Sequence, residues 1–372
     1  MFVHGIIFLI FLTKNKKKVV EQNSQIRIKD IAQKADVSIG TVDRVLHNRG
    51  EVAEKTRRKV LKIIKELNYH PNLMASTLAS KKTVLFATLF PQPPSPEAYW
   101  NKPLTGVKKR ITELQQYGVT AQNFTFSQFD ATDFEVQANK ILEVNPDGVV
   151  LAPFYSRESR RFVNLLNERK IPFIYIDSEI KNTGQISYVG QDSFQSGRLA
   201  AQLIGSITPV NKIIWVVHFA KEMDNQNHLV LRERGFYDWF QANQTERTIK
   251  TLEISNTECC DWENTITSGF ISEKPGGIFV TNSKVYLMAG YLEKHNISDI
   301  KLIGHDLLAE NRKYLNNNLV DFLICQRPEE QGYSSINKLF QHVLLKKEVQ
   351  PENYTPIDIV TKENVDYYKD FN

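Results

Sequence analysis

The chain has 372 residues, a length that favours two or three compact domains over one. Hydrophobic residues make up 41% and charged residues 24% of the sequence, which are ordinary globular values and exclude a chain that is disordered throughout. The net charge of +5 is unevenly spread, because residues 24–82 carry +7 and residues 83–372 carry −5, so we expect a polyanion-binding module attached to a body that binds something else.

Residues 1–23 combine an apolar run, from Phe2 to Leu12, with a cluster of lysines from Lys14 to Lys18 that gives this segment a charge of +3. The run is shorter than the roughly 20 apolar residues that span a bilayer. In a signal peptide the positive charges precede the apolar stretch, whereas here they follow it. We therefore expect a disordered leader or a translation start placed too early, with a membrane anchor as the alternative.

Three short helices are predicted between residues 28 and 68, within a first domain, or head, of residues 24–70. Apolar residues recur at helical spacing over 28–35, and Ser38 is a good N-cap for a second helix. The sequence Asn-Arg-Gly at 48–50 is a stop signal. The third helix, from about residue 54 to 67, is predicted to bury Val60, Leu61, Ile63, Ile64 and Leu67. Two helices joined by a tight turn and braced by a third predict a helix-turn-helix, with a purely structural bundle as the alternative.

The residues of this segment resemble the head of the LacI/GalR family of bacterial repressors. The matching blocks are IKDIAQKADVSIGTVDRVLHN at 28–48, Thr-Arg at 56–57 and LNYHPN at 67–72, in the family's order and spacing. The resemblance implies that the second helix lies in the major groove of double-stranded DNA, with Ile39 and Gly40 at its main sequence-reading positions. Arg44 is then the base-contacting arginine, suited to bidentate bonding with guanine. The other implied DNA contacts are Ser38, Thr41, Asn48, Thr56, Tyr69, Asn72, Ala75 and Leu78.

Four positions of the head depart from the family pattern. Gly40 has no side chain, so readout there must be weak or based on DNA shape. Asp36 replaces the usual turn glycine, and aspartate tolerates left-handed backbone better than most residues. Ala53 replaces the usual serine cap of the third helix, a loss of about 1 kcal/mol. Asp43 stands where serine is usual and would repel a nearby phosphate.

Residues 71–82 follow the head and can form one short helix, which would be marginal in isolation. The resemblance implies a hinge helix that pairs with its twin from a second subunit in the minor groove. Its wedging leucine corresponds to Leu78, which would pry open a base step. A plain linker is the alternative.

From residue 83 onward, apolar runs alternate with helical stretches. The predicted strands are 84–90, 148–152, 172–176, 212–217, 277–280 and 301–304, and the predicted helices are 106–117, 157–169, 195–205 and 285–295. This alternation predicts an α/β domain with doubly wound parallel sheets. Its length favours two lobes, an N-lobe of residues 83–188 and 326–353 and a C-lobe of residues 189–325 and 354–372. Ligands of such folds bind beyond the carboxyl ends of the strands, where polar residues such as Asp177 follow the apolar runs.

Short blocks of this domain resemble the periplasmic-binding-protein-like sensor of the same family, among them residues 189–192, 232–236, 280–282, 304–306 and 325–328. The resemblance implies that the ligand's hydroxyls bind Arg232, Asn282, Asp306 and Gln326. Aspartate accepts two hydrogen bonds and arginine donates several, which suits a vicinal diol. The implied stacking aromatic is Trp262, with Phe154 and Trp100 completing a sandwich, and core packing is the alternative for these rings. A proline-rich loop at 92–100 makes the first wall of this pocket unusual.

Catalysis is not expected from this sequence. No GxGxxG follows the first strand, and the chain has no P-loop, HExxH or GxSxG motif. The cysteines Cys259, Cys260 and Cys325 lack metal-binding spacing, and their odd number indicates a reducing compartment. We expect no cofactor and no metal.

The sequence thus predicts a cytoplasmic, nucleoid-associated homodimer without membrane contact, whose partners are an operator DNA and a small effector, a sugar. A non-sugar effector, or an enzyme with a DNA-binding head, is the alternative. Whether the effector releases or tightens DNA binding stays open.

Overall fold

The computed structural model describes residues 26–46, 48–67, 69, 83–96, 98–219, 227–254 and 261–371. The chain divides into two compact units, Met1–Leu73 and Met74–Asn372. The predictions for the leader at 1–23, for Asn72, Ala75 and Leu78, and for the hinge helix lie outside the described residues. Among the described residues, every helix is too short or too polar to span a bilayer.

The first unit contains α1 (Ile28–Ala35), α2 (Ile39–Leu46) and α3 (Glu54–Glu66). The predicted cap of α2 is confirmed, because the Ser38 hydroxyl oxygen accepts the Thr41 backbone N–H at 3.1 Å. Asp36 adopts φ 54° and carries the turn between α1 and α2 without a glycine. Ala53 makes no side-chain cap bond at the start of α3, as expected from its missing hydroxyl.

The core of the first unit is formed by all three helices, with Ile31 and Ala35 of α1 against Val42 of α2 and Val60 of α3. The prediction that Leu61 is buried is wrong, because its side chain is 47% exposed. The buried stripe of α3 follows residues 60, 63, 64 and 67, and Leu61 lies about 100° away from it around the helix.

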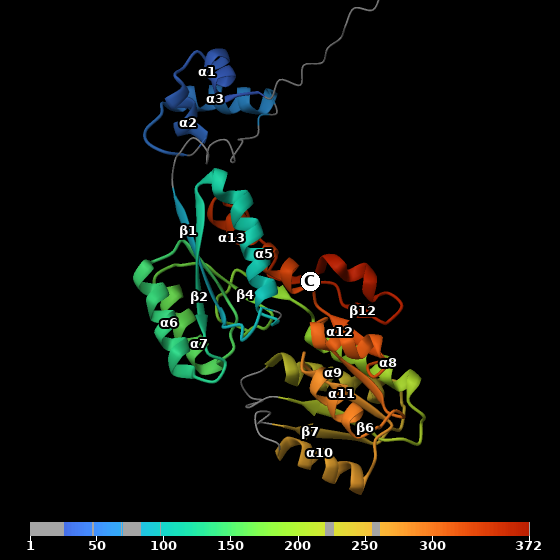
Figure 1. The fold of residues 1–372 in the computed structure, drawn as a ribbon. Helices are drawn as coiled ribbons and strands as arrows, with labels where there is room; N and C mark the ends of the chain where they lie inside the picture. Colours follow the sequence, from blue (N-terminus) through green and yellow to red (C-terminus); the bar gives the residue numbers. More distant parts are fainter. Residues whose placement is uncertain are drawn as a thin grey trace, which may run out of the picture. The chain divides into compact units, whose positions relative to one another are not determined.

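The first lobe of the second unit is built on a parallel sheet. Its strands are β1 (Val84–Pro91), β2 (Val119–Phe126), β3 (Gly148–Leu151), β4 (Phe173–Ile176), β5 (Ser187–Gly190) and β11 (Glu352–Tyr354), in the spatial order β11-β5-β4-β3-β1-β2. One face is covered by α5 (Asn101–Leu114), which runs into η1 (Gln115–Tyr117), and by α13 (Pro328–Val343). Figure 1 shows α6 (Ala131–Val144) and α7 (Ser156–Glu168) on the other face.

The second lobe repeats this plan. Its strands are β6 (Ile214–His218), β7 (Ile249–Glu253), β8 (Gly277–Val280), β9 (Lys301–His305), β10 (Phe322–Cys325) and β12 (Asp358–Val360), in the order β12-β10-β9-β8-β6-β7. All pairings are parallel except that of β12 with β10. Side chains of α8 (Ser193–Ile207) and α9 (Asn227–Ala242) pack on one face. Those of α10 (Asp261–Ser272) and α11 (Val285–Lys294) pack on the other, with α12 (Ala309–Asn316).

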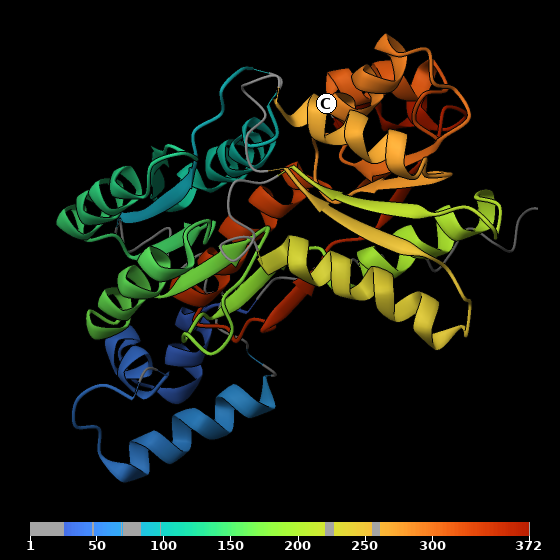
Figure 2. The ribbon, with the colours of Figure 1, turned by 90° about the horizontal axis from the view of Figure 1, so that it is seen from below.

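The chain crosses between the lobes at 191–192, 326–327 and 355–357. In Figure 2 the orange-red α13 lies beside the green strands of the first lobe, although the chain reaches this helix only after β10. The strands β5 and β11 extend to residues 190 and 354, slightly beyond the lobe limits of 188 and 353 that the sequence predicted.

The predicted doubly wound α/β fold is confirmed, with differences in detail. The helix predicted at 106–117 begins earlier, at Asn101, and its last three residues form a 3₁₀ turn. Six of the described strands were not among those predicted, namely β2, β5, β7, β10, β11 and β12. Of these, β5 and β10 are only four residues long.

Two glycines bring α8 and α9 into close backbone contact. A Cβ on Gly197 of α8 would lie 1.9 Å from the Arg232 carbonyl oxygen, and one on Gly235 of α9 would lie 2.0 Å from the Phe194 carbonyl oxygen. Since backbone atoms cannot rotate away, any side chain at these positions forces the helices apart. This contact sets the position of Arg232 on α9.

The substitution Gly197→Ala is expected to destabilise the second unit by about 1–3 kcal/mol, the usual effect of overpacking a tight contact. Thermal unfolding measures it. Gly290→Ala is the matched control within a helix, because the nearest atom to its new Cβ is the Tyr314 hydroxyl at 3.2 Å, the movable end of a side chain. Equal unfolding temperatures for the two variants would show that α8 and α9 can separate freely.

Candidate functional site

The first candidate surface is the solvent-exposed face of α2. Val42 and Val45 point into the core of the head, whereas Ser38, Ile39, Gly40 and Arg44 are exposed. Ile39 is 54% exposed, a large fraction for an apolar side chain. The structure therefore presents the predicted reading residues on one face, with Thr41 half-buried beside them.

Asn48, a predicted DNA contact, is held in the turn after α2. It has φ 52° in the left-handed region, and its side-chain oxygen accepts a hydrogen bond from the Arg57 guanidinium of α3. Thr56 is half-buried next to Arg57, and Tyr69 packs against the head's core. Of Thr56 and Arg57, the sequence analysis predicted only Thr56 as a DNA contact. The role of Arg57 could have been suspected from its place, a basic residue in the first turn of α3 close to the Asn-Arg-Gly stop.

The second candidate surface is a group of polar side chains contributed by both lobes, called here the interlobe cluster: Tyr99, Asp177, Arg232, Asp306 and Gln326. It arises from the repeated topology, because β4 and β9 occupy the same place in the two sheets and each is followed by an aspartate. Asp177 and Asp306 both adopt left-handed backbone, with φ 68° and 65°. Both backbone N–H groups bond the neighbouring strand, to Val189 and Ile324 respectively.

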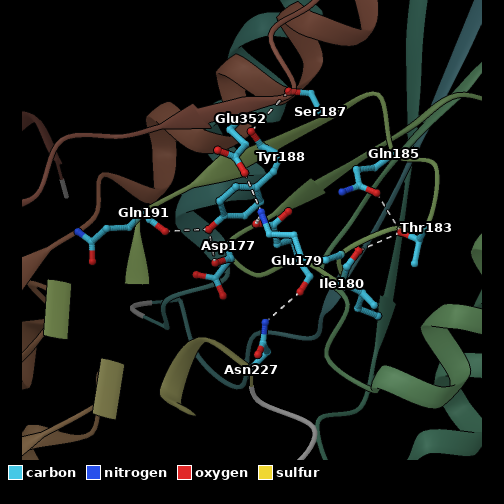
Figure 3. A network of polar contacts seen from close by, with 11 residues as sticks. Asp177, Glu179, Ile180, Thr183, Gln185, Ser187, Tyr188, Gln191, Asn227 and Glu352 are labelled. Carbon is cyan, nitrogen blue, oxygen red and sulfur yellow. Dashed lines mark hydrogen bonds and ion pairs between the residues drawn. The ribbon is translucent and has the colours of Figure 1, made fainter. Parts of the chain in front are cut away.

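Asp177 is fixed by two tyrosines. The Tyr99 hydroxyl donates to its carboxylate at 2.6 Å, and the Tyr188 hydroxyl lies 3.0 Å from its carbonyl oxygen and 2.9 Å from that of Gln191. Figure 3 shows Tyr188 between Asp177 and Gln191, with Glu179 and Asn227 close by. The first crossover between the lobes is therefore tied to the turn that carries Asp177.

On the second lobe, Gln326 links Arg232 and Asp306. Its amide nitrogen lies 3.2 Å and 3.4 Å from the two carboxylate oxygens of Asp306, and its amide oxygen lies 3.5 Å from an Arg232 nitrogen. Arg232 also donates to the Thr281 carbonyl oxygen at 2.7 Å and is only 2% exposed. Its Nε has no partner among the described residues, so the guanidinium keeps free donor capacity.

Burial dominates the electrostatics of the cluster. It raises the pKa of Asp306 to about 6, against the opposing attraction of Arg232 and with a contribution from the Asp177 charge. Burial also raises the pKa of Asp177. The pKa of Tyr99 lies well above its usual value, first because of burial and then because both carboxylates are near. The cluster thus holds two carboxylates close to an arginine in a water-poor setting.

Two neutral histidines border the cluster. Burial, with the Arg232 charge, lowers the pKa of His228 to about 3, and His305 is shifted well below its usual pKa for the same reasons. The Nδ1 atom of His228 is buried without a partner in the described part of the chain. A neutral imidazole can donate or accept, which adds to the hydrogen-bonding capacity of this region.

A pocket opens beside the cluster. It is lined by Tyr99, Lys102, Asp306, Leu307, Leu308, Cys325, Arg327, Pro328, Asp358 and Tyr368. Lys102 of α5 reaches across the lobes and donates to the Leu307 carbonyl oxygen at 3.0 Å. Cys325 is buried, as expected, and it is one of the residues that line this pocket. In the part of the chain that the structure describes, no group of three or more His, Cys, Asp or Glu is arranged to hold a metal ion.

The predicted aromatic residues lie in their own lobes. Trp100 is 7% exposed and packs on Phe90 and Tyr99, with ring centroids 5.8 Å and 5.2 Å away. Phe154 is half-buried against the first lobe's core. Trp262 is half-buried 5.6 Å from the Phe219 ring. Their contact with a ligand stays a prediction.

Asn282 and Trp262 both contact Phe219. The Asn282 amide donates to the Phe219 carbonyl oxygen at 2.9 Å, and the Trp262 ring packs on the Phe219 ring. The Asn282 side-chain oxygen accepts the Lys284 N–H at 3.2 Å. One amide N–H and one lone pair remain available to a ligand.

Comparison with known proteins identifies the two units. Residues 27–72 match the profile of bacterial regulatory proteins of the lacI family, and residues 87–348 match that of a periplasmic binding protein domain. A candidate LacI transcriptional regulator from Bacteroides fragilis has a solved structure that is 33% identical, with a TM-score of 0.72, and the match covers 77% of this chain and 100% of that one. The chain belongs to the LacI family of bacterial regulatory proteins.

Two curated relatives carry regulatory names. The sucrose operon repressor of Streptococcus mutans is 26% identical over 348 residues, covering 91% of this chain and 99% of the relative. The transcriptional regulator MalR of Streptococcus pneumoniae is 28% identical over 173 residues, covering 46% of this chain, and the match spans about half of MalR, 51%. Both names are those of transcription regulators, which agrees with the expectation from the sequence that this LacI-family chain is a regulator.

Membership in the family supports DNA binding by the first unit and binding of a small effector by the second. The sequence named Arg232, Asp306 and Gln326, which the structure joins by hydrogen bonds. It missed the side chains of Tyr99 and Lys102. Both lie in or just after the proline-rich loop, and the pattern there offered no sign of which way they point.

Proposed function

We propose that this LacI-family chain is a cytoplasmic transcription repressor of carbohydrate-utilisation genes. It binds a palindromic operator as a homodimer and takes a small sugar as effector between the lobes of its second unit. The interlobe cluster carries this proposal, because carboxylates and an arginine come from opposite lobes onto one site. Two carboxylates that accept and an arginine that donates suit the adjacent hydroxyls of a sugar or polyol.

The DNA-binding part of the proposal rests on the exposed face of α2 and on charge. Residues 24–82 carry +7, which favours a polyanion partner. One head reads a single half-site, so a twofold-symmetric operator calls for two chains. The sucrose operon repressor among the relatives supports the assignment to carbohydrate genes.

A ligand screen by thermal unfolding tests the effector. We expect a neutral monosaccharide or polyol to raise the unfolding temperature, since a ligand at 100 times its Kd adds about 2.7 kcal/mol. Sugar phosphates should be weaker, because Asp177 and Asp306 would repel their charge. The same compound must then change the affinity for operator DNA, because an effector acts only through its differential affinity for two states.

Two results would change this view. If a nucleoside or an amino acid bound more tightly than any neutral sugar, the proposed regulatory role would stand, but the effector would belong to a different chemical class. A sugar that binds tightly without changing operator affinity would contradict its role as effector.

A further inference from the structure

The exposed face of α2 presents an apolar side chain beside a position without one. Ile39, on the first turn, is 54% exposed. Val42 and Val45 of the same helix lie in the core of the head and are 0% and 5% exposed. Among the described residues, a Cβ on Gly40 would have the Ser38 hydroxyl, at 3.8 Å, as its sole neighbour within 4 Å, so packing in this part of the fold does not require glycine there. Arg44 follows one turn later and is exposed.

The exposed part of the Ile39 side chain does not contribute to folding. An isoleucine half open to solvent gains little from the hydrophobic effect until a partner covers it. Residues 24–82 carry a net charge of +7, which favours a polyanionic partner such as the phosphate backbone of the proposed DNA. On the major-groove edge of DNA the base pairs present hydrogen-bonding groups and one apolar group, the C5 methyl of thymine. That methyl group is the chemical complement of Ile39.

We infer that Ile39 recognises a thymine methyl group in each operator half-site, next to a base position that Gly40 leaves without a side-chain contact. The inference rests on the proposed DNA-binding function and adds to it the chemistry of one base. Arg44 supplies hydrogen bonds, and Ile39 supplies discrimination by shape and apolar contact. Cytosine lacks the methyl group at the same position and is therefore disfavoured opposite Ile39.

The test uses the full chain and synthetic DNA. Duplexes that bind are first selected from a randomised pool, and each thymine of the selected site is then replaced in turn by uracil, which deletes only the methyl group. We expect one thymine per half-site whose replacement weakens binding about fourfold, and about 15-fold when both half-sites are changed, the value of one buried methyl group each. In Ile39→Ala the effect of this uracil should disappear.

Leu61→Ala is the matched control, because it removes an aliphatic side chain of similar exposure, 47%, from α3 of the same head. The uracil effect should persist in it. Ile39→Val keeps both γ-carbons, loses only the δ-methyl group and should retain most of the effect. Thermal unfolding of each variant verifies that the head is intact.

The outcomes separate the inference from the proposed function. Normal binding to every uracil-containing duplex would overturn the methyl recognition and leave DNA binding in place. A uracil effect of full size in Ile39→Ala would assign the methyl contact to another residue and overturn the inference equally. Failure to select any duplex would instead contradict the proposed function itself.

Discussion

The substitution Arg44→Ala is expected to weaken operator binding by roughly 5- to 150-fold for each half-site, because a bidentate arginine–guanine contact contributes about 1–3 kcal/mol. Arg44 is exposed on the same face of α2 as Ile39 and Gly40. Since neither of those positions has a hydrogen-bonding side chain, we expect Arg44 to carry most of the polar base recognition by this helix. Titration of the selected operator duplex by fluorescence anisotropy measures the loss. Effector affinity should stay unchanged, since the substitution lies in the other unit.

Arg58→Ala is the control for loss of charge. Arg58 lies on α3 with its side chain 79% exposed and pairs with Glu54 at 3.0 Å. Its removal should weaken binding to operator DNA and to random DNA to the same small extent. Arg44→Ala should reduce the preference for operator over random DNA. If Arg44→Ala weakened both kinds of DNA equally, Arg44 would be a phosphate contact and base recognition would lie elsewhere.

The head could be predicted closely from its sequence because its signals are local. A serine cap, an Asn-Arg-Gly stop and an apolar stripe each act within one or two turns of helix, so the bounds of α2 and α3 followed directly. The error at Leu61 was also local. This residue is apolar like a core residue, but it lies just outside the buried stripe of α3 and its side chain points toward solvent.

The sheets were predicted less completely, for a physical reason. Strands such as β3 and β8 are covered on both faces and appear as continuous apolar runs. The strands β2 and β7 pair on one side only, and their exposed or half-buried positions interrupt the apolar pattern. The three-residue β11 and β12 depend on neighbours far away in the chain, which no local pattern contains.

The interlobe cluster shows the same division. Asp306 could be found because it lies just after an apolar run and within a block that resembles the family's sensor domain. Tyr99 could not, since it meets Asp177 only through the packing of the proline-rich loop, 78 residues away in the sequence. Its neighbour Trp100 was predicted as a ligand contact, and its ring packs on Phe90, so that contact stays a prediction. Strand ends can be located from sequence, whereas the direction of a loop side chain depends on the folded context.

The substitution Asp306→Asn is expected to raise the stability of the ligand-free protein and to lower effector affinity by about 100-fold or more, because hydrogen bonds to a charged group contribute about 1.5–3 kcal/mol each. Asp306 is only 5% exposed, and burial raises the pKa of its carboxyl to about 6 from the ordinary 3.8. The folded state therefore binds this proton more tightly than the unfolded state. Between about pH 4 and 6 the ionisation of this carboxyl lowers the free energy of unfolding as the pH rises, and the full loss is present at pH 7. An amide of the same shape removes it.

Thermal unfolding at pH 7 and ligand titration by calorimetry measure the two effects. Asp321→Asn is the matched control, because Asp321 precedes β10 at the opposite end of the same sheet and pairs with Lys301 at 3.1 Å. It should lower stability slightly and leave effector affinity unchanged. In the unsubstituted chain, effector affinity should fall as the pH drops through about 6, where Asp306 takes up its proton.

The opposite signs of the two effects make this test selective. A residue that merely supports the fold loses stability and binding together when it is replaced. A buried carboxylate that is retained to bind a ligand lowers the stability of the protein. Its replacement by a neutral isostere should therefore raise stability and lower ligand affinity. Loss of both in Asp306→Asn would show that the bonds to Gln326 and the attraction of Arg232 hold the second lobe together. The ligand would then have to be bound by Asp177 and Tyr99 of the first lobe.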